Sequence, residues 1–118
     1  DVNFSFLGKT RFWNFLTRDY DPINAPKFKV NAKVAYNADR GFHGNIGFRY
    51  IPEFDWSAGV HYGTIDEYLV IDSMVGYRFG KRYDLLLNIN NLNGDVHREI
   101  IGGPKLGRHI TLKLNARF

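Results

Sequence analysis

The groups in this sequence best suited to chemistry are four histidines and two pairs of neighbouring carboxylates. The histidines, His43, His61, His97 and His109, are too far apart along the chain for the short spacing of a typical zinc motif. Cysteine is absent, which excludes a thiolate metal site and a disulfide framework. We therefore predict no metal site.

The carboxylate pairs are Glu53 with Asp55 and Asp66 with Glu67. General acid–base catalysis requires a carboxyl group whose pKa is matched to its task by its surroundings. Glu53 and Asp55 share one face of an extended chain, but both pairs fall near the ends of predicted strands, where water solvates them. We predict no catalytic residue, and that the chain is not an enzyme.

A glycine-rich segment, 102–108, superficially resembles a phosphate-binding loop. Arg108 stands where such a loop carries lysine, His109 stands where it carries Ser or Thr, and a strand pattern follows instead of a helix. Gly41, Gly44 and Gly47 lie within a strand pattern, where small residues on a sheet explain them better than a dinucleotide site does. The sequence predicts no cofactor.

The element that organises the chain is its last ten residues, 109–118, which alternate between apolar and polar side chains. One face of this predicted strand carries Ile110, Leu112, Leu114, Ala116 and Phe118, and the other carries His109, Thr111, Lys113, Asn115 and Arg117. Similar alternation predicts strands over 2–7, 28–36, 42–51, 68–79 and 85–92. Val70, Met74 and Leu86 violate the pattern because they are apolar on the polar face.

The segments between these strands predict how the strands connect. Turn-forming residues predict short turns over 37–41, 63–67 and 80–84, and longer loops over 8–26 and 93–108. We expect residues 53–62 to continue the preceding strand beyond Pro52. The aromatic residues Phe12, Trp13 and Phe15 are expected either to pack against neighbouring loops or to contact a ligand. The predicted fold is an all-β antiparallel meander of about six strands.

The composition is typical of strands that are solvated on one face and apolar on the other. Among 118 residues, 16% are aromatic, yet the mean hydropathy is only -0.34. No run of about 18 apolar residues occurs, but a β-strand crosses a bilayer with about 9 to 11 alternating residues. The net charge of +4 is scattered, so nucleic acid is not an expected partner. Because the chain begins with Asp1, we expect a processed or partial chain.

Aromatic residues gather beside the predicted short turns. If neighbouring strands are antiparallel, one end of the sheet collects Tyr36, Phe42, Tyr77, Phe79, Tyr83 and Phe118. Such rings prefer the headgroup region of a membrane, which predicts an interfacial aromatic belt.

Three stretches carry a resemblance to a known family. They are Asn24-Ala25-Pro26-Lys27 opening a strand, Ile89-Asn90-Asn91-Leu92 closing one, and Pro104-Lys105-Leu106-Gly107-Arg108 leading into the last strand. Their order and distances resemble the C-terminal end of a TonB-dependent outer-membrane receptor of Gram-negative bacteria. The chain departs from the family at Asn93-Gly94, where an aromatic residue is usual after the Asn-Leu pair.

The resemblance implies that residues 1–118 are a wall segment of a barrel of about 22 strands that imports scarce nutrients. The implied partners are the remaining strands, outer-membrane lipid, a plug domain and the barrel-assembly machinery, whose recognition signal Phe118 resembles. The plug and the TonB-contacting segment have no match here. The residues expected to face the lumen or the plug are Lys33, Arg49, Arg78, Asn88, Asn90, Lys113 and Arg117.

Among the cationic residues of this set, Arg78 and Arg117 are predicted to lie at the level of the short turns. They are expected either to be solvated in the lumen or to contact carboxylates of a plug domain. Two alternatives remain open at this point. One is a soluble antiparallel β-barrel or sandwich that binds a small apolar ligand, and the other is a passive porin or structural barrel subunit. The substrate is not readable from these residues, since specificity depends on loops and a plug that lie mostly outside them.

Overall fold

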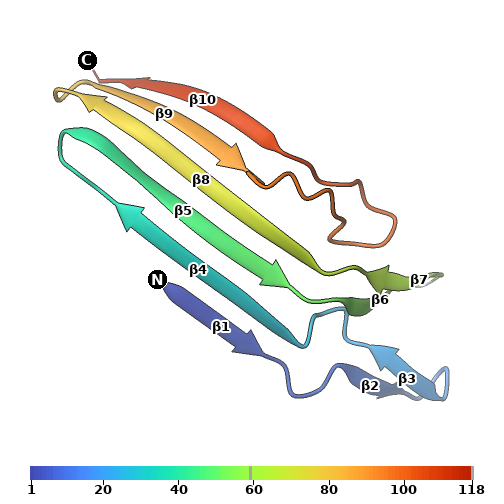
Figure 1. The fold of residues 1–118 in the computed structure, drawn as a ribbon. Coiled ribbons are helices and arrows are strands. Elements are labelled where there is room, and N and C mark those ends of the chain that lie inside the picture. Colours follow the sequence, from blue (N-terminus) through green and yellow to red (C-terminus); the bar gives the residue numbers. More distant parts are fainter. Residues whose placement is uncertain (59, 118) are drawn as a thin grey trace.

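The computed structural model describes residues 1–58 and 60–117, and they form ten strands and no helix (Figure 1). The strands are β1 (Val2–Phe6), β2 (Arg11–Asn14), β3 (Asp19–Pro22), β4 (Phe28–Tyr36), β5 (Gly41–Ile51), β6 (Phe54–Ala58), β7 (His61–Ile65), β8 (Tyr68–Phe79), β9 (Tyr83–Asn90) and β10 (His109–Ala116). In these residues no helix is long and apolar enough to span a membrane.

Six strands form one antiparallel sheet in the order β1-β4-β5-β8-β9-β10, while β2-β3 and β6-β7 form two separate hairpins. Residues 37–40 and 80–82 make the short turns at one end of the sheet, here called the turn end. Both hairpins and residues 91–108 lie at the opposite end, the loop end (Figure 1). The predicted all-β antiparallel meander is therefore confirmed, but over the described residues the sheet is open, with β1 and β10 as its edges.

The molecule is elongated because its main sheet is a single layer. Its principal extents are 64 × 27 × 27 Å and its radius of gyration is 19.3 Å. A compact domain of this length has a radius of gyration of about 13 to 14 Å. The sheet therefore does not pack against a second sheet from the described part of the chain.

Three sequence predictions about the loop end are wrong. Residues 53–62 do not continue β5, because β6 and β7 pair with each other in a hairpin of their own. The predicted turn at 63–67 accordingly contains the last residues of β7. Within the predicted loop 8–26, β2 and β3 form a second hairpin, in which Trp13 lies opposite Tyr20.

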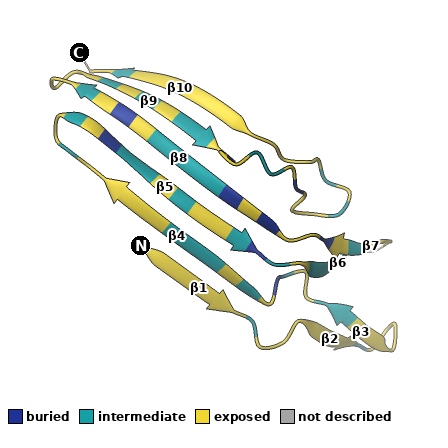
Figure 2. Ribbon diagram, viewed as in Figure 1, coloured by how far each residue is buried: buried dark blue, intermediate teal, exposed yellow. Residues whose placement is uncertain are grey.

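The buried core is small and lies at the loop end (Figure 2). It consists of Ile51, Ile65, Tyr68 and Val70, with Phe54, Trp56 and Ile101 packed against it. Val70 violates the alternation for this reason, since it is only 3% exposed within this cluster. Burial of apolar area there holds the β6-β7 hairpin and the 91–108 loop against the sheet.

β9 ends at Asn90 because Asn91 adopts a left-handed backbone conformation, with φ of 58°. Asparagine tolerates this conformation better than most residues. The side chains of Asn93 and Asp95 then bond the backbone of β8, accepting from the N–H groups of Ile71 and Leu69. Side chains thus replace the missing strand partner of β8 at the loop end.

Candidate functional site

The most distinctive surface of the protein is one continuous apolar face of the six-stranded sheet. This apolar face consists of the even-numbered residues of β1, β4, β5 and β10 and the odd-numbered residues of β8 and β9. Cross-strand register aligns them in rows, of which one contains Val34, Ile46, Ser73, Ile89 and Ile110. Val34 and Leu112 are each 67% exposed. Large apolar side chains therefore make up this face, and no layer formed by the described residues packs over them.

Five residues of the predicted aromatic belt lie on this face at the turn end. Phe42 contacts Tyr77 with ring centroids 4.8 Å apart, and Tyr77 contacts Phe79 at 4.7 Å. Phe79 pairs with Tyr83 across the sheet, and Tyr36 lies on the same face in β4. These five rings are all exposed. Phe118, predicted both for the belt and as the assembly signal, lies outside the described residues.

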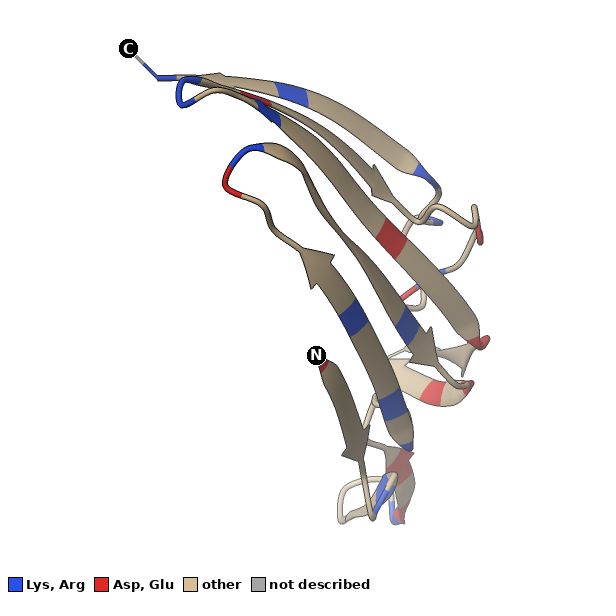
Figure 3. Ribbon diagram, turned by 60° about the vertical axis from the view of Figure 1, so that its left-hand side comes forward, with Lys and Arg blue, Asp and Glu red and all other residues tan. Residues whose placement is uncertain are grey.

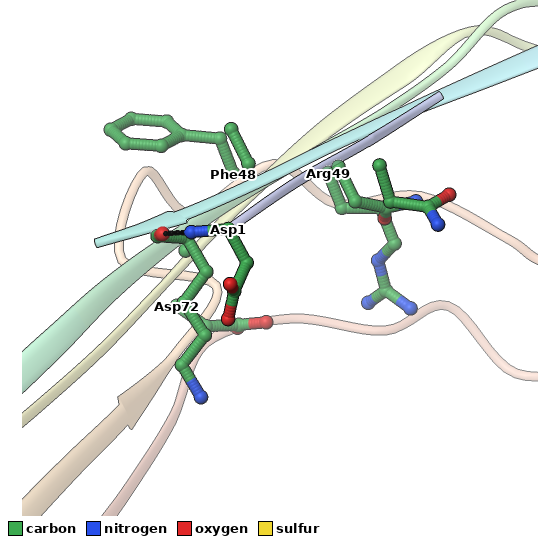
Figure 4. Close-up of a pocket in the computed structure, with 9 residues that line it drawn as sticks. Asp1, Phe48, Arg49 and Asp72 are labelled. Carbon is green, nitrogen blue, oxygen red and sulfur yellow. Dashed lines mark hydrogen bonds between the residues drawn. The ribbon is translucent and has the colours of Figure 1, made fainter. Parts of the chain in front are cut away.

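The residues predicted to face the lumen all lie on the opposite side of the sheet, the polar face. In the register these are Lys33, Arg49, Arg78, Asn88, Asn90 and Lys113, and Arg117 continues the same side beyond β10. Figure 4 shows the alternation directly, because Phe48 projects from one side of the sheet while Arg49 and Asp72 project from the other. A shallow pocket of about 280 Å³ lies there, lined by Asn31, Lys33, Arg49 and Asp72 among others.

A polar network crosses three strands on the polar face near the turn end. The ring of His43 in β5 lies across Gly76 of β8, and its Nε2 is 2.8 Å from Oδ1 of Asp84 in β9. Since a carboxylate only accepts, this nitrogen is the donor. Arg78 contacts the other oxygen of Asp84 at 3.9 Å and donates to Asn37. His43 is only 6% exposed, whereas the side chains of Arg78 and Asp84 are 30% and 25% exposed. Only the His43 ring of this network is therefore buried.

The 91–108 loop folds over the polar face at the loop end. Tyr68 of β8 stacks on His97 with ring centroids 4.1 Å apart. Nδ1 of His97 donates to the carbonyl of Asp95 at 3.1 Å, whereas its buried Nε2 has no hydrogen-bond partner and lies 3.8 Å from Glu99. Glu99 also lies 3.8 Å from Arg49 of β5. The loop is thus anchored to the sheet by stacking, charge and the contact of Ile101 with the core.

The two hairpins are clamped to each other. Asn24 donates to the carbonyl of Ser57 and accepts from the Ser57 N–H, at 2.6 and 2.7 Å. Arg11 bonds Asp55 at 2.8 Å. That hydrogen bond, reinforced by the charge of Asp55, raises the pKa of the Arg11 guanidinium above its ordinary value. The loop end therefore presents both hairpins as one unit.

The aromatic residues of the first hairpin only partly match the expectation that they pack. Trp13 contacts Tyr20 edge-on at 5.1 Å. Phe12 is 51% and Phe15 is 85% exposed, so these two rings are not covered by neighbouring loops.

The His43–Asp84–Arg78 network was missed by sequence reasoning. His43 precedes Arg78 by 35 positions and Asp84 by 41, and the three residues lie on separate strands. Their proximity therefore depends on register, which alternation leaves undetermined. A usable signal existed in the sequence, because Gly76 interrupts the middle of a long strand and thereby leaves room for a ring.

Comparison with known proteins identifies no relative of this chain. No protein-family model, curated protein or solved structure matches the chain. Over the described residues there is also no group of three or more His, Cys, Asp or Glu side chains arranged to hold a metal ion. The functional interpretation therefore depends on the two faces of the sheet.

Proposed function

We propose that this chain is a wall segment of an outer-membrane β-barrel in a Gram-negative bacterium, with its apolar face in contact with lipid. The observation that carries the proposal is the continuous, exposed apolar face opposite a polar one. In water a face of this size is a liability, since monomeric soluble proteins rarely expose apolar patches larger than a few hundred Å². Acyl chains remove that cost.

The length of the central strands supports the same proposal. β5 and β8 pair over 11 consecutive positions, from Gly41 opposite Arg78 to Ile51 opposite Tyr68. At about 3.4 Å per residue and a tilt of about 40°, this paired region spans about 28 Å along the membrane normal. That value is close to the hydrocarbon thickness of about 30 Å.

The two edge strands of the sheet indicate that the proposed barrel wall requires further strands. β1 and β10 each pair on only one side within the described residues. Unpaired backbone groups in hydrocarbon cost several kcal/mol each, so an open sheet cannot span a bilayer by itself. The proposed partners are therefore the remaining strands of the barrel, and the chain contributes one part of its circumference.

We assign the barrel more specifically to the TonB-dependent nutrient-import receptors, with about 22 strands and a plug in the lumen. The support for this assignment is the resemblance of residues 24–27, 89–92 and 104–108 in their order and spacing. Asn91, in the second stretch, also has a clear structural role in ending β9. In this proposal Phe118 is the signal for the assembly machinery, and the chain itself carries no catalytic role.

The polar face supplies the proposed contacts with the lumen and the plug. Arg78 is already held by Asp84 and Asn37 of its own chain. Arg117 is exposed at the turn end and is the better candidate for a plug carboxylate. Charge reversal at Arg117 should therefore weaken plug retention or transport more than charge reversal at Lys105, at the loop end.

The principal rival is a soluble barrel or sandwich with the apolar face turned inward. Such a fold requires a second layer over that face, whereas the buried core here consists of four residues on the other side. Fractionation separates these possibilities. The proposal predicts that the intact protein sediments with outer membranes and needs detergent for extraction, and release as a soluble monomer would contradict it.

The transporter assignment has its own test, because a passive porin or structural barrel subunit shares the fold. Uptake through an energised receptor should stop when TonB is deleted or the proton gradient is collapsed. Diffusion through a passive pore would continue under both conditions, and that outcome would remove the receptor assignment while leaving the barrel intact.

A further inference from the structure

One buried group in the 91–108 loop is left unsatisfied. Within residues 1–58 and 60–117, Nε2 of His97 is the only buried side-chain nitrogen or oxygen atom without a hydrogen-bond partner. A buried polar group without a partner destabilises the conformation that holds it, so such groups are few in native proteins. The docked loop therefore keeps this ring in surroundings that do not satisfy it.

The neighbours of the His97 ring explain why its Nε2 has no partner. Nδ1 lies 3.1 Å from the carbonyl oxygen of Asp95, and because that oxygen only accepts, Nδ1 carries the proton of the neutral ring. Nε2 of the neutral ring then presents a lone pair, and it lies 3.8 Å from a carboxylate oxygen of Glu99. Two acceptors face each other, so no hydrogen bond forms. A second proton on the ring turns Nε2 into a donor beside that carboxylate.

The other charged and titratable groups around His97 come from β5, β8 and the loop itself. Tyr68 of β8 stacks on the ring with centroids 4.1 Å apart, and an aromatic face attracts a cation. Arg49, the only Lys or Arg of β5, lies 3.8 Å from Glu99 and, like burial of the ring, opposes a second positive charge (Figure 3). The carboxylate of Asp95 accepts from the backbone of β8. The cationic residues of the loop are all exposed, and they are Arg98, Lys105 and Arg108.

We propose that the 91–108 loop is a pH-sensitive strap over the polar face, which tightens when His97 gains a proton and donates from Nε2 to Glu99. A released loop separates His97 from Glu99 and Tyr68, so the docked loop binds the proton in preference to the released one. The added anchoring is therefore present at acidic pH and is lost as the pH rises through the range in which histidine titrates, between about pH 5 and pH 8. Charge-assisted hydrogen bonds are about twice as strong as neutral ones, which favours this outcome over the opposing charge of Arg49. All of these groups lie within the chain, so the inference does not depend on the proposed function.

The test measures amide hydrogen exchange of the intact protein at about pH 5.5 and about pH 7.5, two values within the range in which histidine titrates. Protection factors, which remove the intrinsic effect of pH on exchange, should be about tenfold higher at the lower pH for residues 95–99 and unchanged for β5.

Variants identify the proton that is responsible. His97→Gln cannot gain a proton in this range, and His97→Phe also cannot but keeps a ring to stack on Tyr68, so both should lose the pH response. Glu99→Gln removes the charge of the acceptor and should weaken the response. His109→Gln is the matched control, because it removes an exposed imidazole directly after the loop and should leave the response intact.

Several outcomes would overturn the proposal. Equal protection at the two pH values, or weaker protection at the lower one, would show that protonation does not tighten the loop. A response that persists in both His97 variants would assign it to another group, and a full response in Glu99→Gln would remove Glu99 as the acceptor. Each of these results leaves the proposed function untouched, because fractionation and uptake test that function separately.

Discussion

The two faces of the six-stranded sheet follow different rules, although the same strands build both. The apolar face is regular, and its rows run from strand to strand without an internal covering layer. The polar face is interrupted, because the 91–108 loop covers it at one end and the His43–Asp84–Arg78 network fills it near the other. The regular apolar face is what contact with a uniform apolar environment would favour. The interruptions of the polar face come from specific contacts within the chain.

The largest effect is expected from placing a charge on the apolar face. Ile46 lies in the middle row of that face, and its neighbour Asn45 lies on the polar face. In a bilayer, Ile46→Arg should lower the free energy of unfolding by about 2 to 4 kcal/mol, while Asn45→Arg should change it little. Denaturant unfolding in lipid vesicles measures the difference. Equal effects of the two variants would contradict the assignment of the faces.

A methyl group added at Gly76 should disturb the polar face. Its Cβ would collide with the ring of His43, so that Gly76→Ala must displace the ring from Asp84. We expect a loss of about 1 to 3 kcal/mol in the free energy of unfolding. Gly47→Ala on the same face is the matched control, because its Cβ would meet only the carbonyl oxygen of Ala32 at 3.8 Å. Equal stability of both variants would rule out an important role for the His43 ring.

A smaller, more local effect is expected at Asn91, where the loop leaves β9. Asn91→Ala places a residue with poor left-handed propensity at φ of 58° and removes the hydrogen bonds that the side chain makes with the backbone of Asp95. Asn91→Gly removes only the hydrogen bonds. Amide hydrogen exchange should therefore increase across residues 92–99 in both variants, and more in the alanine variant. Unchanged exchange would show that the loop is anchored mainly by Tyr68, His97 and Ile101.

Alternation predicted the sheet well because it reports which side of a strand meets which environment. The bounds of β4 and β8 match the predicted strands, and every residue assigned to the polar face lies there within the described part of the chain. Alternation failed at residues 53–62, where it continues through a hairpin, since pairing partners and chain reversals leave period two unchanged. The departure of Val70 from the alternation correctly indicated a buried position on the polar face. The residues that bury it could not be predicted, because they come from segments that fold back onto the sheet.

The aromatic belt and the cationic concavity at the turn end, which is lined by Arg40, Lys81, Arg82 and Arg117 among others, also differ in how far the sequence predicts them. The aromatic residues were identified because strand direction alone brings them to one end. The concavity was not, because Arg40, Arg82 and Arg117 become neighbours only when the two turns and the end of β10 are placed side by side.

The most direct test of the central claim compares adjacent residues of β10, Leu112 on the apolar face and Lys113 on the polar face. Leu112→Cys and Lys113→Cys are treated with a water-soluble maleimide in intact outer membranes, and both are treated again after denaturation to show that each thiol is reactive. We predict that Cys at 113 reacts readily and that Cys at 112 is shielded by lipid. Rapid labelling at 112 with protection at 113 would show that the apolar face does not face acyl chains.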